Sequence, residues 1–121
     1  DKGMRFATTI EPCSFQGDKN LLQKAISNII GNAILHSPAG AAVTVSLLDS
    51  VLTVENTGSP IEREDMEQLF EPFYRVDRSH NRYTGGSGLG LYIVKTILDR
   101  HQLRYRLENT DTGVRFTVSF R

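Results

Sequence analysis

The alternation of apolar and polar residues changes period along the chain, and each change marks an expected element. Residues 4–10 alternate with a period of two, which is typical of a β-strand. Residues 19–36 instead repeat apolar positions every three or four residues, which predicts a helix with one face turned to a core. Asp18 is placed to cap the start of that helix. The core-facing stripe consists of Leu22, Ala25, Ile26, Ile29 and Ala33.

Two strand-like runs and a short helix come next. Residues 42–48 and 51–55 are rich in β-forming side chains, and the Asp-Ser dipeptide between them predicts a tight hairpin turn. Residues 56–60 combine Asn, Gly, Ser and Pro, which favours a loop. Residues 62–70 begin with acidic side chains, which suit the positive end of a helix dipole, and Pro72 ends this short helix.

The last third of the chain predicts a long loop, a helix and a second hairpin. Residues 75–87 are polar and show no periodicity, and loops of this length are usually functional or mobile. Residues 88–101 return to the helical period. Residues 103–109 and 114–120 alternate like strands, and the turn-forming residues 110–113 join them.

The order of these elements predicts an α/β fold of the α+β type. We expect a two-layer sandwich, in which a mostly antiparallel mixed sheet carries about three helices on one face. A length of 121 residues fits one compact domain that needs no disulfide or metal to hold its core. We therefore expect residues 1–121 to form a single domain.

Composition narrows the classes of function. Lys plus Arg and Asp plus Glu balance at 14 each, so there is no basic excess of the kind that nucleic-acid-binding proteins usually carry. A phosphate site must therefore be built locally. The single Cys13 can form neither an intrachain disulfide nor a cysteine-based zinc cluster, which suits a reducing compartment. No segment approaches the ~20 apolar residues that cross a bilayer.

Two asparagines on the first long helix are the first candidates for chemistry. Asn28 and Asn32 lie four residues apart, so their carboxamides point the same way. They could be solvent-facing or core-capping amides. Since Asn is a poor residue for a helix interior and its carbonyl oxygen suits Mg²⁺, a magnesium and phosphate site is the alternative.

Glycine-rich segments indicate two further candidate sites. Asn56-Thr57-Gly58 follows a strand and could be a simple turn or could aim the Asn side chain into a cleft. The segment from Gly86 to Leu91 opens a helix, where unpaired N–H groups and the helix dipole favour an anion such as a triphosphate. It fits neither a dinucleotide-binding fingerprint nor a P-loop, and a flexible hinge is an equal alternative.

The segment Phe70-Glu71-Pro72-Phe73-Tyr74-Arg75 places aromatic side chains beside an arginine at the mouth of the long loop. We expect the aromatic residues to pack in the core. Arg75 is either a surface charge or a clamp on a transferring phosphate. The loop that follows is locally basic and could hold a nucleotide tail or be an ordinary solvated loop, and it carries Arg78, Arg82 and His80 against Asp77.

Together, these segments resemble the catalytic domain of bacterial sensor histidine kinases, within the wider GHKL family that includes gyrase B, Hsp90 and MutL. Nearly the whole chain takes part, and the kinases of vancomycin-resistance systems (VanS-like) are similar. In chain order the matching segments are Asn28-Ile29-Ile30-Gly31-Asn32-Ala33 for the N box, Asn56-Thr57-Gly58 for the first glycine box, Phe70-Glu71-Pro72-Phe73 for the F box, and Gly86-Ser87-Gly88-Leu89-Gly90-Leu91 for the second glycine box.

The resemblance implies a Bergerat-type fold and a site for ATP and Mg²⁺ under the loop 75–87, which we expect to be disordered without nucleotide. Asn32 would coordinate Mg²⁺, Asn28 would place its waters or the phosphates, Asn56 would read the adenine amino group, and Arg75 would approach the γ-phosphate. The residues expected to contact the cofactor are Asn28, Asn32, His36, Asn56, Gly58, Ile61, Tyr74, Arg75, Gly86, Ser87, Gly88, Leu89 and Gly90, with Asn28 and Arg75 also catalytic.

Three positions bear on how closely the family chemistry applies. The usual Asp of the first glycine box is Asn56, which keeps an acceptor but loses a charge-assisted bond. The usual second Gly of that box is Pro60, which fixes φ and removes an N–H, so the shape of the loop is open. Where gyrase and Hsp90 have a water-activating Glu, this chain has Asn28, so we expect slow ATP hydrolysis.

The function implied is transfer of the γ-phosphoryl group to a histidine on a separate dimerisation domain of the same kinase, which this chain lacks. His36, His80 and His101 have no helical His-Glu/Asp context, and His101 is expected to cap a helix end. A homodimeric parent anchored in the cell membrane, a cytoplasmic location and a response regulator are implied as well. The alternatives are a degenerate nucleotide-binding or docking module and a serine kinase of the anti-sigma-factor type.

Overall fold

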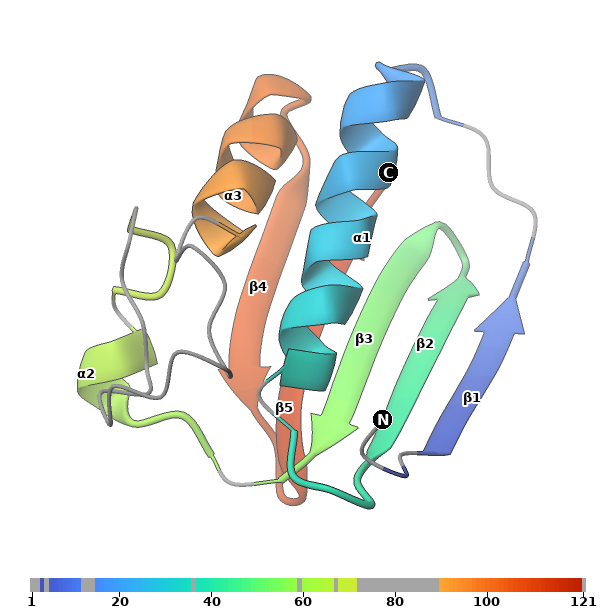
Figure 1. Cartoon of the computed structure of the whole chain (residues 1–121). Helices are drawn as coiled ribbons and strands as arrows, with labels where there is room; N and C mark the ends of the chain where they lie inside the picture. The colour runs from blue at the N-terminus through green and yellow to red at the C-terminus, as the bar shows by residue number, and fades with distance from the viewer. Residues whose placement is uncertain are drawn as a thin grey trace.

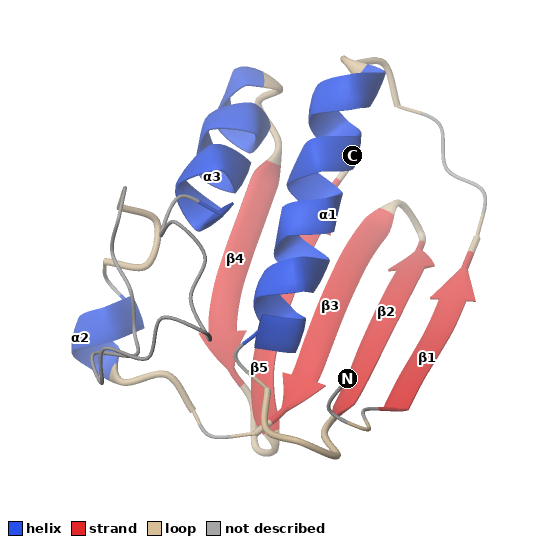
Figure 2. Cartoon of the chain, in the orientation of Figure 1, coloured by secondary structure: helices blue, strands red, loops and turns tan. Residues whose placement is uncertain are grey.

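The chain folds into two layers, a five-stranded sheet with helices packed on one of its faces (Figures 1 and 2). The structure is a computed structural model that describes residues 3, 5–11, 15–35, 37–58, 60–66, 68–71 and 90–120. The elements are β1 (Arg5–Ile10), α1 (Lys19–Leu35), β2 (Ala42–Leu48), β3 (Val51–Thr57), α2 (Arg63–Met66), α3 (Gly90–Arg100), β4 (Arg104–Asn109) and β5 (Gly113–Ser119).

The sheet is mixed, with strand order β1-β2-β3-β5-β4. β1 pairs with β2 in parallel, and the other neighbouring strands are antiparallel. Helix α1 follows β1 and provides the crossover that a parallel pair requires. The predicted two-layer fold with a mostly antiparallel mixed sheet is therefore confirmed.

The core lies between the sheet and the helices α1 and α3. The α1 residues Ala25, Ile29 and Ala33 are buried, as the helical period predicts. Across from them, alternate residues of the central strands are buried, and full burial of a Val or Leu side chain contributes about 1.5–3 kcal/mol. The remaining buried members of this core are Val43, Leu52, Val54, Leu69, Leu91, Val94, Ile97, Leu98, Leu103, Phe116 and Val118.

A histidine joins the start of α1 to the end of α3. The Asp18 side chain accepts a hydrogen bond from the Leu21 N–H at 3.0 Å, which confirms the predicted N-cap. The Asp18 N–H donates to Nε2 of His101 at 3.0 Å, so Nδ1 carries the ring proton and donates to the Ile97 carbonyl at 2.8 Å. The His101 ring thus caps α3, as expected, and holds the two helix ends together.

Two elements near the site, β3 and α2, have bounds that differ from the sequence prediction. β3 extends to Thr57, so Asn56 and Thr57 belong to a strand rather than to a loop, because both pair with β5. Helix α2 covers only Arg63–Met66 instead of residues 62–70. Beyond it Leu69 is buried and Phe70 packs on Phe116 with ring centroids 6.1 Å apart, so tertiary contacts replace the helical period.

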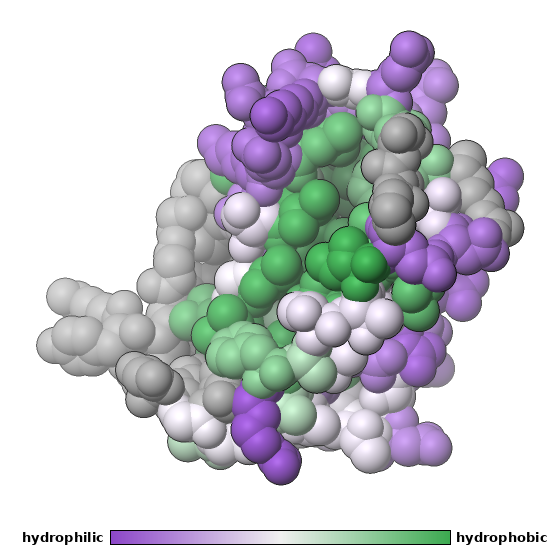
Figure 3. Space-filling view, turned by 90° about the vertical axis from the view of Figure 1, so that its right-hand side faces the viewer, coloured by the Kyte–Doolittle hydropathy of each residue, from purple (hydrophilic) through white to green (hydrophobic). Residues whose placement is uncertain are grey.

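The β1 edge of the helix-covered face is open. Phe6 and Ile10 are 58% and 64% exposed. Their partners on β2 are Val43, which is buried in the core, and Leu47, which packs against the core. The view onto the β1 side shows apolar side chains running along this edge (Figure 3). The helices therefore cover the centre of the sheet and leave its first strand uncovered.

The turn between β2 and β3 is tight, as predicted. Asp49 and Ser50 have φ values of 53° and 62°, which is the geometry of a two-residue hairpin turn. No helix among the described residues is long and apolar enough to cross a membrane. The loop 75–87 lies outside the described residues.

Candidate functional site

A cavity of about 170 Å³ lies between α1, the central strands and the segment that follows β3. Among the described residues, its lining is apolar apart from two carboxamide side chains. Such a surface, with a few polar groups to fix orientation, is typical of a site for a small organic ligand. The lining residues are Ile29, Asn32, Ala33, Val54, Asn56, Pro60, Ile61, Leu69, Leu107, Val114 and Phe116.

Asn56 is the most deeply placed polar group of the cavity. Leu52, Val54 and Asn56 alternate along β3 and are all buried, so the Asn56 side chain points to the helix-covered face. Only 8% of the residue is exposed, and its carboxamide makes no hydrogen bond to any described residue. Since a buried amide without a partner is costly, this position suits a group that becomes paired when a ligand enters.

Helix α1 brings the second carboxamide to the cavity. Asn32 lines it together with Ile29 and Ala33, which flank it on the same side of the helix. Asn28 lies one turn earlier, is half-buried, and is not among the lining residues. The structure therefore brings Asn32 and Asn56 together, and it does not place Asn28 on the same cavity wall.

The segment after β3 closes one side of the cavity with Pro60 and Ile61. Gly58 has a φ of 147°, and its N–H donates to the Thr112 carbonyl at 3.0 Å, so the chain turns sharply against the β4–β5 hairpin. A side chain at Gly58 would also approach Pro38 to 3.0 Å. Gly58 thus shapes the loop and does not line the cavity, whereas Pro60, where the resemblance implies a glycine, forms part of an apolar wall.

Asn109, which the sequence analysis did not single out, holds Ile61 in place. Its Oδ1 accepts a hydrogen bond from the Ile61 N–H at 2.8 Å, and its Nδ2 donates to the Ile61 carbonyl at 3.0 Å. Asn109 is the last residue of β4, so this pair of hydrogen bonds ties the cavity wall to the edge strand of the sheet that lies opposite β1. An Asn before a turn is too common a pattern to reveal this contact in advance.

Gly113 is a second residue that the sequence analysis missed. A Cβ atom built on Gly113 would overlap the backbone carbonyl oxygen of Asn56, so only glycine allows β5 to approach β3 at this point. The Thr110 hydroxyl also accepts a hydrogen bond from the Gly113 N–H at 3.0 Å. The position of Asn56 in the cavity therefore depends on a glycine in the neighbouring strand.

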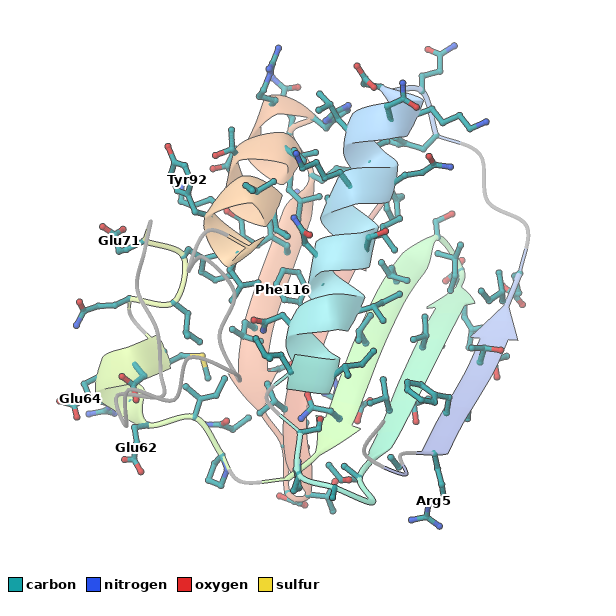
Figure 4. All side chains as sticks on the ribbon, in the orientation of Figure 1. Arg5, Glu62, Glu64, Glu71, Tyr92 and Phe116 are labelled. Carbon is teal, nitrogen blue, oxygen red and sulfur yellow. The ribbon has the colours of Figure 1, made fainter. Side chains whose placement is uncertain are left out.

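An aromatic cluster supports the sheet side of the cavity. Phe116 lies between the sheet and the helices, and Glu62, Glu64 and Glu71 extend outward on the α2 side (Figure 4). Tyr105 stacks on Phe116, with ring centroids 6.2 Å apart and ring planes at 11°. Phe70 packs against this core, as expected, whereas Phe73 and Tyr74 of the same segment lie outside the described residues. Phe116 lines the cavity.

The described groups with shifted pKa values lie away from the cavity lining. The hydrogen bond to Lys95, at 2.9 Å, lowers the pKa of Asp99 and raises the pKa of Lys95. Burial raises the pKa of Tyr105, whose hydroxyl donates to Asp99 at 3.0 Å. On the strands, the bond to Glu55 raises the pKa of Arg115. No lining residue is titratable, so the described part of the cavity can bind and orient a ligand but offers no acid or base.

The second glycine box is described only at its end. Gly90 begins α3, is half-buried and does not line the cavity. Leu91, the last member of the second glycine box, is buried in the core. The remaining predicted site residues lie outside the described residues, and they are His36, Tyr74, Arg75, Gly86, Ser87, Gly88 and Leu89.

Comparison with curated proteins relates the chain to sensor kinases. Over 112 residues it is 41% identical to the probable sensor kinase SilS of Salmonella typhimurium, which covers 89% of this chain and 22% of that protein. Over 103 residues it is 44% identical to the sensor protein VanSB of Enterococcus faecalis, covering 82% of this chain and 23% of that protein. The chain thus spans about a quarter of the length of these relatives, and a VanS-like resemblance is compatible with them.

Solved structures and a family model agree with this relation. The mycobacterial sensor histidine kinase MprB superposes with a TM-score of 0.83 at 30% identity, covering 98% of this chain and 83% of that one. The catalytic domain of histidine kinase ThkA, in a nucleotide-free form, shares the fold with a TM-score of 0.80 at 24% identity, over 98% of this chain and 78% of that one. The model of the histidine kinase-, DNA gyrase B- and HSP90-like ATPases matches residues 17–121. The chain therefore belongs to this ATPase family, on the branch formed by the catalytic domains of sensor histidine kinases.

Proposed function

We propose that this domain binds ATP with Mg²⁺ and transfers the γ-phosphoryl group to a histidine on a separate dimerisation domain of the same kinase. One observation carries the proposal, which is the nearly buried and unpaired carboxamide of Asn56 in an otherwise apolar cavity. The adenine ring would lie among the apolar side chains, and its exocyclic amino group would donate to Asn56. Family membership supports ATP as the ligand.

The residues available for Mg²⁺ fit a site completed by the nucleotide. No group of three or more His, Cys, Asp or Glu side chains that could hold a metal occurs among the described residues. Mg²⁺ usually keeps several waters and takes few protein ligands, so the amide oxygen of Asn32 would suffice beside phosphate oxygens. When bound, Mg²⁺ supplies charge neutralisation on the triphosphate. Asn28, one turn away, would orient waters or phosphates.

The remaining roles follow the resemblance of the sequence motifs. Arg75 would stabilise charge at the γ-phosphate, and the backbone of the second glycine box would hold the phosphates, with Gly58, Ile61 and Tyr74 at the nucleotide. Transfer would depend on positioning and electrostatics, because phosphoryl transfer needs little covalent help from the protein. The acceptor imidazole would come from the dimerisation domain.

The same proposal extends to partners and location. The parent would be a homodimer that passes the phosphoryl group on to a response regulator, and it would be anchored in the cell membrane with this domain in the cytoplasm. Direct contact of this domain with nucleic acid or with the membrane is not part of the proposal, since its net charge is zero.

Calorimetric titration with Mg-ATP and then Mg-GTP tests the site. We expect ATP to bind, GTP to bind much more weakly or not at all, and Asn56→Ala to lose about 1–3 kcal/mol of ATP binding, because one buried polar partner is removed. Asn20→Ala is the matched control, since Asn20 is exposed in the first turn of α1 and does not line the cavity. Equal ATP affinity for Asn56→Ala and the control would contradict the proposal.

A transfer assay separates the alternatives. The domain is mixed with labelled ATP and the His-bearing dimerisation domain, and acid-labile label on that domain is the expected result. Binding without transfer would favour a nucleotide-sensing or docking module, for which the Asn56 and Pro60 replacements are the specific support. Acid-stable label on a partner serine would favour a serine kinase of the anti-sigma-factor type.

A further inference from the structure

The base-reading position of the cavity carries a carboxamide, and this changes which bases it can read. A carboxamide has a carbonyl acceptor and an NH₂ donor side by side, whereas a carboxylate only accepts. Adenine presents an amino donor at C6 beside an acceptor at N1. A 6-oxopurine presents the reverse, an acceptor at O6 beside the N1–H donor. Rotation of a carboxamide by half a turn exchanges its two groups, so Asn56 can pair with either edge.

Nothing in the described part of the site fixes the carboxamide of Asn56 in one orientation. Neither its oxygen nor its nitrogen has a hydrogen-bond partner among the described residues, and no fully inaccessible side-chain atom of the described chain is left unpaired. The two terminal atoms of Asn56 must therefore be reachable from the cavity. The backbone of β3 is held on both sides by Val43 and Val114, so the side chain can rotate without movement of the strand.

The rest of the cavity discriminates at a different point of the purine ring. Guanine adds a 2-amino group next to N1, and this group needs an acceptor when it leaves water. The lining around Asn56 is apolar, with Val54, Val114 and Phe116 on the strands. The Ile61 backbone already exchanges two hydrogen bonds with Asn109. The other polar lining group, Asn32, comes from helix α1 on the other layer.

We propose that Asn56 makes this site indifferent to the group at C6 of a purine, and that the apolar lining around it makes the site selective against the 2-amino group, so that the site accepts inosine triphosphate about as well as ATP and rejects GTP. This inference rests on the proposed nucleotide site and specifies which purine bases that site accepts. Asn56 is then a specificity-determining residue, because an aspartate at the same place would accept the adenine amino group and repel O6.

The test is a set of calorimetric titrations with Mg-ATP, Mg-ITP and Mg-GTP on the wild-type chain and on Asn56→Asp. For the wild type we expect ITP to bind within about fivefold of ATP and GTP roughly 5- to 150-fold more weakly, the range that an unpaired buried donor imposes. For Asn56→Asp we expect ATP binding to persist while ITP loses at least about tenfold more affinity than ATP.

Asn56→Ala provides a second test if the buried carboxylate prevents folding, which a thermal melt would reveal. Removing the whole carboxamide should weaken ATP and ITP by the same factor. Wild-type ITP binding more than tenfold weaker than ATP binding would overturn the proposal and leave the ATP site intact. GTP binding as tight as ITP binding, or an unchanged ratio of ITP to ATP affinity in Asn56→Asp, would also overturn it. If none of the three nucleotides binds, both this inference and the proposed function fail.

Discussion

At the scale of single residues, the shape of the site depends on two residues that do not line the cavity. Asn109 makes two hydrogen bonds to the backbone of Ile61, and Ile61 forms part of the cavity wall. Gly113 lets β5 approach the Asn56 carbonyl. Both residues would act on a ligand through a neighbour, so their effect on binding should be separable from their effect on folding.

Substitution of Asn109 should weaken ATP binding because Ile61 loses its backbone partners. Each hydrogen bond contributes about 0.5–1.5 kcal/mol net, so we expect Asn109→Ala to raise the Kd for Mg-ATP by roughly tenfold. Asn109→Asp keeps the bond from the Ile61 N–H and loses the one to the Ile61 carbonyl, so its Kd should be intermediate. Arg106→Ala on the exposed part of the same strand is the control. Equal ATP affinity for Asn109→Ala and the control would mean that the wall holds without this clamp.

The sequence alone could identify the residues of the cavity only where a family motif marks them. Asn32, Asn56 and Ile61 lie where the resemblance implies a nucleotide, and all three line the cavity. Asn109 and Gly113 carry no comparable mark, because a turn-forming Asn and Gly at the end of a strand have an ordinary local explanation. Their role depends on contacts of Asn109 with Ile61 and of Gly113 with Asn56, which are 48 and 57 positions apart (109 − 61 and 113 − 56), and a local pattern contains no information on such contacts.

At the scale of elements, hydrophobic period predicted the long helix and the hairpins well and the short helix poorly. α1 and α3 each bury one regular stripe, so the period is strong. α2 has four residues, and the acidic residues that start it do not determine where it stops. β3 continues through Asn56 because pairing with β5 outweighs the preference of Asn and Gly for turns.

Two glycine-to-alanine changes should have opposite effects on stability. Gly31 lies in the middle of α1, is exposed, and a Cβ there would meet no described atom within 4 Å. Gly31→Ala should stabilise the fold by about 0.5–1 kcal/mol, because it reduces the entropy of the unfolded chain. Gly113→Ala should destabilise it, since the new methyl group overlaps the Asn56 carbonyl. Urea denaturation measures both, and a lower midpoint for Gly31→Ala would contradict the helix geometry.

The contact between the two long helices should also be measurable through His101. His101→Ala removes the hydrogen bonds to Asp18 and Ile97 and leaves the Asp18 N–H without its partner. We expect a loss of about 1–3 kcal/mol in the free energy of unfolding. Arg100→Ala, at the exposed end of α3, is the control and should change stability by less than about 0.5 kcal/mol. If the two variants melt together, the histidine does not join the helices in solution.

At the scale of the whole molecule, the layer architecture followed from the order of elements, and the extent of its coverage did not. Two amphipathic helices and alternating strands require a helix-on-sheet sandwich. The sequence pattern does not predict that the helices leave β1 uncovered, because Phe6 and Ile10 alternate with polar residues as core residues do, yet both are exposed. Which strands a helix covers depends on sheet order and on where the crossover lies, and neither is encoded in local period.

The proposed division of chemistry between this domain and a separate acceptor predicts how the domain behaves alone. With saturating labelled Mg-ATP, the isolated chain should acquire no stable phosphoryl label. It should release phosphate with a kcat far below about 1 s⁻¹, which is itself the lower end of the typical range for enzymes. No residue lining the described cavity is titratable, and the carboxamide of Asn28 cannot remove a proton from water.

Asn28→Ala should therefore leave this slow hydrolysis unchanged within about twofold, while Asn28→Glu, which introduces a base at that turn, should raise it. Phosphate release is followed at several ATP concentrations, so that changes in affinity are separated from changes in rate. Steady turnover that Asn28→Ala abolishes would show that the domain activates water by itself. The proposed need for a histidine from another domain would then not account for slow ATP hydrolysis.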